Sequence, residues 1–345
     1  MNSTGSEVRF ENGDFNDFVL RPDTNGNHIN AHHGGILFVN GKYWWYGQAN
    51  QEKPESDPSK PAGATTREGV VMYSSPDLRE WTYEGVILAC EPSGALKGPM
   101  RFERPKIIYN AKTKQFVMWY HHVTTPGRHG YEIGMGDAGV ATCDTINGTY
   151  TFHGYQRPAG PDMRVADSTL FQDDDGKAYF IYDSLQEGRR DERCLHISEL
   201  SEDYLTSVHV RKIPELIRRE APAMIKRDGF YFLLTSGLTG WDPNPARCHR
   251  ATNIWGPYDD LGDPCSGENA EITYNSQSTY VFELQDKPGS LVFMGDRWNL
   301  NNMKLCAHIW LPLEFPTKDT LELKYHAVWE TGLFDRMQSS TERRQ

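Results

Sequence analysis

The segment Gly35-Ile-Leu-Phe-Val-Asn-Gly-Lys-Tyr-Trp-Trp-Tyr46 decides the fold, because it describes a β-hairpin that recurs along the chain. Two runs of β-branched and aromatic residues flank Asn40-Gly41, and both residues of an Asn-Gly turn tolerate the positive φ that a two-residue hairpin needs. Four later hairpins have their turns at Lys112–Lys114, Asp173–Gly176, Asp228–Gly229 and Asp286–Gly289.

The spacing of these hairpins predicts a ring of similar units. Their apolar runs begin near Ile36, Ile107, Thr169, Ala223 and Thr279, at intervals of 71, 62, 54 and 56 residues. Periods of this size are typical of propellers and other repeat arrays. No long amphipathic helix and no linker interrupts the pattern. We therefore predict an all-β fold, a single five-bladed β-propeller over residues 1–345 with four strands per blade. The first blade is expected to start at about residue 30, with short N- and C-terminal extensions.

Composition excludes several classes of partner. A net charge of −11 argues against nucleic acid, which needs a basic surface. No apolar stretch reaches the length of about 18 residues that a membrane span requires. The first residues lack the regions of a signal peptide, so we expect a cytoplasmic protein unless a leader was removed. The six cysteines form no CxxC pair, and most are expected to be buried thiols.

One polar side chain stands near the start of each apolar run: His33, Glu103, Asp167, Glu220 and Gln277. In a propeller the innermost strands line one channel, so these side chains should meet at a single mouth. Bringing carboxylates together costs free energy, because like charges repel and burial disfavours ionisation. Such an arrangement favours a chemical role, although these side chains could instead only solvate the channel.

The carboxylates suit the cleavage of a glycosidic bond. That reaction needs an acid to protonate the leaving oxygen and an activated water or nucleophile on the other side. Glu220 suits the acid role if Asp167 raises its pKa. Arg104 either pairs with Glu103, grips a sugar hydroxyl or is only a charge on the rim. Trp241 and Trp298 are candidates to stack on a sugar ring, with a place in the core as the alternative.

Longer motifs resemble glycoside hydrolase family 43, and within it the branch of exo-β-1,3-galactanases. The resemblance runs from about residue 21 to 313 and implies an inverting enzyme that removes terminal galactose from β-1,3-galactan, such as the arabinogalactan backbone. The matching segments are Gly26–His32, Tyr43–Gly47, Phe102–Lys106, Asp167–Gly176, Glu220–Met224, Thr235–Asn244, Ser276–Thr279 and Met294–Trp298.

The resemblance implies a role for each residue. Glu220 matches the general acid, Asp167 the carboxylate that tunes and orients it, and Gln277 a glutamine that the branch is thought to use with the water. Glu103 matches a residue that holds the sugar and has been considered for catalysis. The expected substrate-binding residues are Gln48, Arg104, His32, His33, Trp241, Thr239 and Trp298. Two positions depart from the branch: Gln48 replaces a common glutamate, and His32-His33 replaces a more usual His-Gly.

Gln277 raises a chemical problem, because a neutral amide is a very weak base. Either it passes through an imidic acid tautomer, or it only positions water while Glu103 supplies negative charge. Both routes stay open. For an inverting enzyme we expect Glu220 and Gln277 to be separated by about 6.5–9.5 Å.

Two other functions stay open. The chain could act on another terminal sugar, such as arabinofuranose or xylose. It could also be a non-catalytic sugar-binding propeller, because the family's usual aspartate base is missing from Asn30-Ala-His-His33. In every case the expected partner is an oligo- or polysaccharide. We predict no cofactor and no metal ligand, with a calcium ion in the channel near His32 or Gln277 as the open alternative; the oligomeric state is not predicted.

Overall fold

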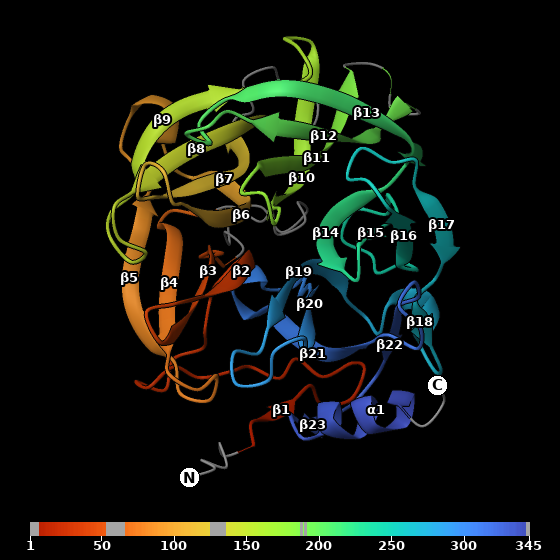
Figure 1. The fold of residues 1–345 in the computed structure, drawn as a ribbon. Helices are drawn as coiled ribbons and strands as arrows, with labels where there is room; N and C mark the ends of the chain where they lie inside the picture. Colours follow the sequence, from red (N-terminus) through yellow and green to blue (C-terminus); the bar gives the residue numbers. More distant parts are fainter. Residues whose placement is uncertain (1–6, 53–65, 125–135, 187–188, 190–191, 343–345) are drawn as a thin grey trace.

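The computed structural model describes residues 7–52, 66–124, 136–186, 189 and 192–342, and it has five sheets of four or five strands around a common axis (Figure 1). This five-bladed β-propeller confirms the predicted fold class. Blade 1 contains β2 (His32–Val39), β3 (Lys42–Gln48), β4 (Gly69–Ser75) and β5 (Thr82–Ala89). Blade 2 contains β6 (Met100–Asn110), β7 (Gln115–Thr124), β8 (Asp137–Cys143) and β9 (Thr151–Gln156).

Blade 3 contains β10 (Met163–Gln172), β11 (Ala178–Gln186), β12 (Cys194–Leu200) and β13 (Ser207–Ile217). Blade 4 contains β14 (Glu220–Arg227), β15 (Phe230–Ser236), β16 (Arg247–Ala251) and β17 (Asp259–Gly262). Blade 5 contains β19 (Gln277–Glu283), β20 (Leu291–Arg297), β21 (Ala307–Glu314), β22 (Glu322–Lys324) and β18 (Cys265–Ser266). Short 3₁₀ turns are η1 (Gly94–Leu96), η3 (Ala270–Ile272) and η4 (Met303–Leu305).

Blade 5 therefore differs from the expected four strands. The chain leaves blade 4 and adds β18 to the outer edge of blade 5, where Cys265 and Ser266 pair in parallel with Leu323 and Lys324. A two-residue strand has too little hydrophobic pattern to be recognised from the sequence.

Hydrophobic clusters fill the spaces between neighbouring blades. Trp45 of blade 1 packs against Trp310 of blade 5, and Trp119 of blade 2 packs against Phe180 of blade 3. Comparable clusters lie between the other neighbouring blades. A single blade cannot bury both of its faces, so the complete ring is what makes the core.

The N-terminal segment closes the ring from outside. β1 (Arg9–Glu11) pairs with β23 (Val328–Glu330), and α1 (Leu333–Glu342) lies beside them (Figure 1). The Asn12 side chain bonds both backbone groups of Trp310 in β21, donating to the carbonyl and accepting from the amide at 2.9 Å each. The Arg297 guanidinium, in β20, donates to the Asn12 carbonyl at 2.9 Å.

Each of the five innermost strands carries a β-bulge at the same level. The register in which each of these strands pairs with the next strand of its blade shifts in the N-terminal part of the strand; the strands are β2, β6, β10, β14 and β19. The backbone turns to positive φ at His33, Arg104 and Ala221. A bulge bends its strand and redirects the side chains beside it. The repeated bulge therefore orients the polar side chains of all five blades around the channel.

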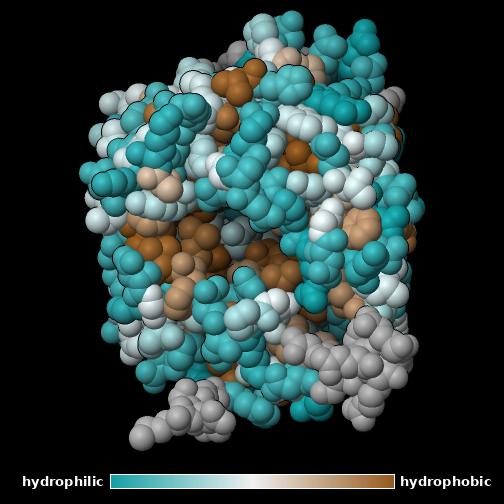
Figure 2. All heavy atoms as spheres, in the orientation of Figure 1, coloured by the Kyte–Doolittle hydropathy of each residue, from teal (hydrophilic) through white to brown (hydrophobic). Residues whose placement is uncertain are grey.

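One face of the molecule is hollowed at the middle of the ring, with hydrophobic residues beside the hollow (Figure 2). All six cysteines are free thiols. Among the described residues, no helix has the length and apolarity needed to cross a membrane.

Candidate active site

Glu220, at the start of β14, is the centre of a buried group of charged side chains. The residue is 5% exposed. The Arg193 guanidinium donates to Glu220 Oε2 at 2.8 Å, and the Gln277 amide donates to Oε1 at 3.1 Å. Arg218 and Arg219 are next to Glu220 in the sequence, but the arginine that pairs with Glu220 is Arg193, which lies just before β12. Strand pairing, which is not local in sequence, brings Arg193 there.

Burial raises the pKa of Glu220 to about 8, with the negative charges of Asp167 and Asp183 adding to the effect and Arg193 and Arg104 opposing it. Glu220 is thus mainly protonated at neutral pH. Burial also raises the pKa of Asp183 to about 6, although Arg193 opposes the change. Asp183 and Arg193 did not stand out in the sequence, because they lie in β11 and just before β12, away from the repeated first position.

Gln277, at the start of β19, uses all of its amide hydrogen-bonding groups. Its nitrogen donates to Glu220 and, at 2.9 Å, to the Ser236 hydroxyl. Its oxygen accepts from Arg104 at 2.6 Å and from the Trp298 indole at 3.2 Å. The wide separation expected between Glu220 and Gln277 is therefore wrong for this structure, since Gln277 Nε2 lies 3.1 Å from Glu220 Oε1. The two strands that carry them are neighbours, so the side chains meet directly.

Arg104 connects three blades. Its guanidinium donates to Gln277, to Asp167 Oδ2 at 3.0 Å, and to the Ser278 carbonyl at 2.7 Å. The side chain is only 2% exposed, so it is no rim charge. Arg104 therefore pairs with Asp167 and not with Glu103, the partner that the sequence suggested. The bulge at Arg104 explains this, because it turns consecutive side chains in different directions.

Glu103 has its own set of cationic neighbours. Arg101 lies 3.2 Å from Oε1, and His121, its cross-strand partner in β7, lies 3.0 Å from Oε2. Burial alone would raise the pKa of Glu103, but Arg101, His121 and His33 together hold it well below its usual range. Glu103 and Glu220 therefore differ in charge at neutral pH, the first ionised and the second mainly neutral.

Three rings form an aromatic wall beside Gln277. His33 lies 4.6 Å from Trp298 and 6.2 Å from Trp241, and the two tryptophans meet edge to face at 5.0 Å. Both tryptophans are half-buried, as expected of aromatic residues that offer a face to a ligand.

The other expected contact residues lie in different surroundings. Gln48 is fully buried, where its carbonyl accepts from the Phe102 amide and its nitrogen donates to Asn50, each at 2.6 Å. Thr239 is exposed and holds its own turn through Asp242 and Asn244. His32 is buried and stacks on His308, with ring centroids 5.0 Å apart.

Comparisons with known proteins agree with this architecture. A model of glycosyl hydrolases family 43 matches residues 59–279. The family 43 β-1,3-galactosidase BT3683, solved with galactodeoxynojirimycin, is 35% identical with a TM-score of 0.79, over 90% of this chain and 98% of that one. The β-1,3-galactosidase BT0265 is 33% identical with a TM-score of 0.82, over 96% of this chain and 65% of that one.

Two further relatives are longer than the match. The exo-β-1,3-galactanase 1,3Gal43A of Clostridium thermocellum is 33% identical with a TM-score of 0.76, over 93% of this chain and 66% of that one. The xylosidase/arabinosidase 43B of Humicola insolens is 31% identical over 128 residues, which are 35% of this chain and 22% of that protein. The family model covers more than half of the chain and the propeller agrees with it, so the chain belongs to glycosyl hydrolases family 43.

Proposed function

We propose that this enzyme is an inverting exo-glycosidase that releases terminal β-1,3-linked galactose from galactan or an arabinogalactan backbone. The observation that carries the proposal is the buried Glu220 carboxyl, which is hydrogen-bonded to Gln277 and whose pKa burial raises to about 8. The sugar assignment draws support from the relatives, among them an exo-β-1,3-galactanase of Phanerochaete chrysosporium solved with β-1,3-galactotriose at 28% identity.

In this proposal Glu220 acts as the general acid. With a pKa of about 8 it holds its proton at neutral pH and gives it to the glycosidic oxygen as the bond breaks. Asp167 keeps that pKa raised through its negative charge. The ionised Glu103 stabilises the positive charge that develops on the sugar in the oxocarbenium-like transition state.

Gln277 positions the attacking water. Its amide is too weak a base to take a proton from water, so in this proposal the proton that the water loses passes to the ionised Glu103 carboxylate. Arg104 fixes the Gln277 oxygen and pairs with Asp167, and so holds the two sides of the site at a constant distance. The aromatic wall of His33, Trp241 and Trp298 offers a face for the terminal sugar.

The test is a substrate screen with product analysis. We expect galactose from β-1,3-galactobiose, with the α anomer appearing first by proton NMR. Replacing Glu220 with Gln should lower kcat/KM at least about 100-fold, the smallest contribution usual for a general acid, while Glu202→Gln on the surface should change it little. An initial β anomer would contradict inversion. Release of arabinose or xylose alone would favour the second sugar class. Binding without any cleavage by the wild-type protein would favour the non-catalytic alternative.

A further inference from the structure

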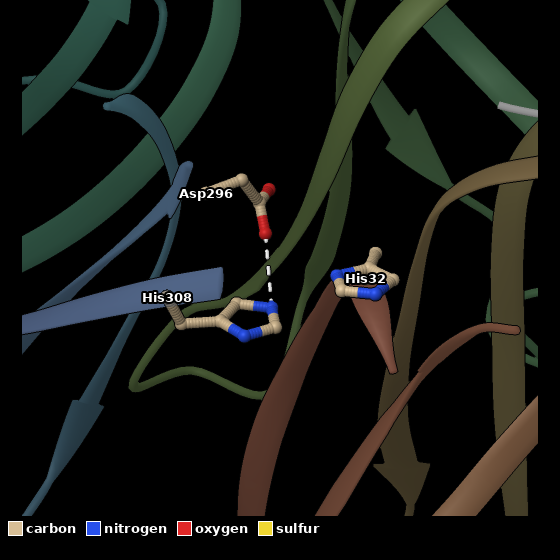
Figure 3. Close-up of side chains that lie close together, drawn as sticks. All are labelled: His32, Asp296 and His308. Atoms are coloured by element: carbon tan, nitrogen blue, oxygen red, sulfur yellow. Dashed lines mark ion pairs between the residues drawn. The ribbon is translucent and has the colours of Figure 1, made fainter. Parts of the chain in front are cut away.

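Three buried side chains that the proposed reaction does not use meet between the first and last blades. They are His32 at the start of β2, Asp296 in β20 and His308 in β21 (Figure 3). One nitrogen or oxygen from each residue lies within 4.8 Å of the others. Their exposed fractions are 0%, 0% and 3%.

The polar atoms of this cluster are poorly satisfied. Neither ring nitrogen of His32, neither carboxylate oxygen of Asp296 and not the Nε2 of His308 has a hydrogen-bond partner among the described residues. The ion pairs of Asp296 are with His308 Nε2, at 3.1 Å from Oδ1, and with Arg104, at 3.9 Å from Oδ2. Buried polar groups are nearly always paired, and each unpaired one costs about 1–3 kcal/mol. A shared ligand would satisfy all three side chains at once.

We propose that His32, Asp296 and His308 bind a divalent first-row transition-metal ion such as Zn²⁺. Two imidazole nitrogens and one carboxylate oxygen are ligands that zinc accepts, with water in the fourth position. Zinc–nitrogen and zinc–oxygen bonds of about 2.0–2.1 Å in a tetrahedron put ligand atoms roughly 3.3 Å apart. The His308 Nε2 to Asp296 Oδ1 distance of 3.1 Å is close to that value.

The same donor set does not fit calcium. Calcium takes about 6–8 oxygen ligands, and this cluster offers the oxygens of a single carboxylate. The Gln277 carbonyl, considered above for a channel calcium, already accepts from Arg104 and Trp298. The imidazole content therefore selects a softer ion than calcium.

Two features of the cluster oppose the binding of a metal ion. The rings of His32 and His308 are nearly parallel, at 8°, so the His32 ring must turn about χ2 to direct a nitrogen at the ion. Arg104 is a competing cation beside Asp296, but it keeps Asp167 at 3.0 Å as a counter-ion when the metal engages Asp296.

The position of the cluster assigns it a structural role. His32 belongs to blade 1, and Asp296 and His308 belong to blade 5, so the ion would join the two blades at which the ring closes. An ion that binds only the folded protein stabilises it by mass action.

Titration of the untagged, chelator-treated protein with Zn²⁺ or Ca²⁺ tests the proposal. We expect one Zn²⁺ bound per chain by calorimetry and a thermal midpoint raised by at least about 3 °C. Calcium should give neither effect. His308→Gln should weaken zinc binding at least about 100-fold, because it removes one of three protein ligands. The matched control is His28→Gln, whose ring lies 6.2 Å from His32, and it should bind zinc like the wild-type protein.

Anomalous diffraction at the zinc edge places the ion independently of any variant. A peak within bonding distance of His308 Nε2 and Asp296 supports the proposal even if His308→Gln fails to fold. A peak at the surface, undiminished zinc binding by His308→Gln, or no stoichiometric binding would each overturn it. Calcium at this cluster would overturn the choice of ion. Catalytic activity is not a readout, so the result does not depend on the proposed galactanase function.

Discussion

Glu220 links the electrostatics of the site to a measurable pH profile. Because the general acid must be protonated, kcat/KM should be constant below its pKa of about 8 and fall about tenfold per pH unit above it. Replacing Asp167 with Asn removes a negative charge that raises this pKa, so the alkaline limb should move to lower pH. Asp162→Asn, on the exposed surface before β10, should leave the limb in place. A limb unmoved in Asp167→Asn would refute the assigned role.

Gln277 should be needed for turnover more than for binding. Replacing it with Ala is expected to lower kcat at least about 100-fold, because water loses the group that positions it. The dissociation constant of galactose, measured by calorimetry, should change only a few-fold. Gln285→Ala, exposed in the turn after the same strand, is the control. Turnover equal to that of the wild-type protein would contradict the assignment.

For single residues, the sequence predicts which positions belong to the candidate site better than it predicts the side-chain contacts of those residues. The shared place of Glu103, Asp167, Glu220 and Gln277 in the repeat predicts that they meet at one mouth of the channel. Their side-chain contacts cannot be predicted from the sequence, because a bulge decides whether Arg104 faces Glu103 or Asp167. Arg193 was missed for a similar reason, since only the pairing of β11 with β12 brings it to Glu220.

The bulge in β14 connects strand geometry to the acid. Ala221, directly after Glu220, has a φ of 52°, which costs a residue with a side chain about 1–2 kcal/mol. Ala221→Gly should therefore keep activity and raise the thermal midpoint. Ala221→Val should lower the midpoint and reduce kcat/KM at least about tenfold, because β-branching strains this conformation and shifts Glu220.

Ala223 provides the control for crowding. It is equally buried in β14 but lies beyond the positive-φ position, so Ala223→Val tests added volume alone. Equal stability of Ala221→Val and Ala221→Gly, by thermal melting, would show that the bulge is not strained.

The sequence predicts the hairpin turns better than it predicts the bulges and the pairing of distant strands. Asn40-Gly41 and Asp228-Gly229 predicted their hairpins, because turn chemistry is local. The bulges and the parallel β18–β22 pair were not predicted, since both depend on which distant strand lies alongside.

For the whole molecule, ring closure depends on the N-terminal segment. Asn12 is fully buried and makes two hydrogen bonds to Trp310. Asn12→Ala leaves both backbone groups without these partners, at a cost of about 1–3 kcal/mol each. We expect the thermal midpoint to fall by at least about 4 °C, against little change for the exposed Asn147→Ala. Equal melting of the two variants would mean that the ring closes without Asn12.

The saturated Gln277 amide has a kinetic consequence for the complete enzyme. All four of its bonding positions are taken, by Glu220, Ser236, Arg104 and Trp298. No lone pair or N–H remains for a nucleophile until one of those bonds opens. The arriving sugar must break one of these hydrogen bonds. Binding of the sugar and the release of Gln277 for hydrolysis are therefore separate steps. Rapid mixing with an indole fluorescence readout of Trp298 should resolve them as a fast phase that scales with ligand concentration and a slower one that reaches a plateau.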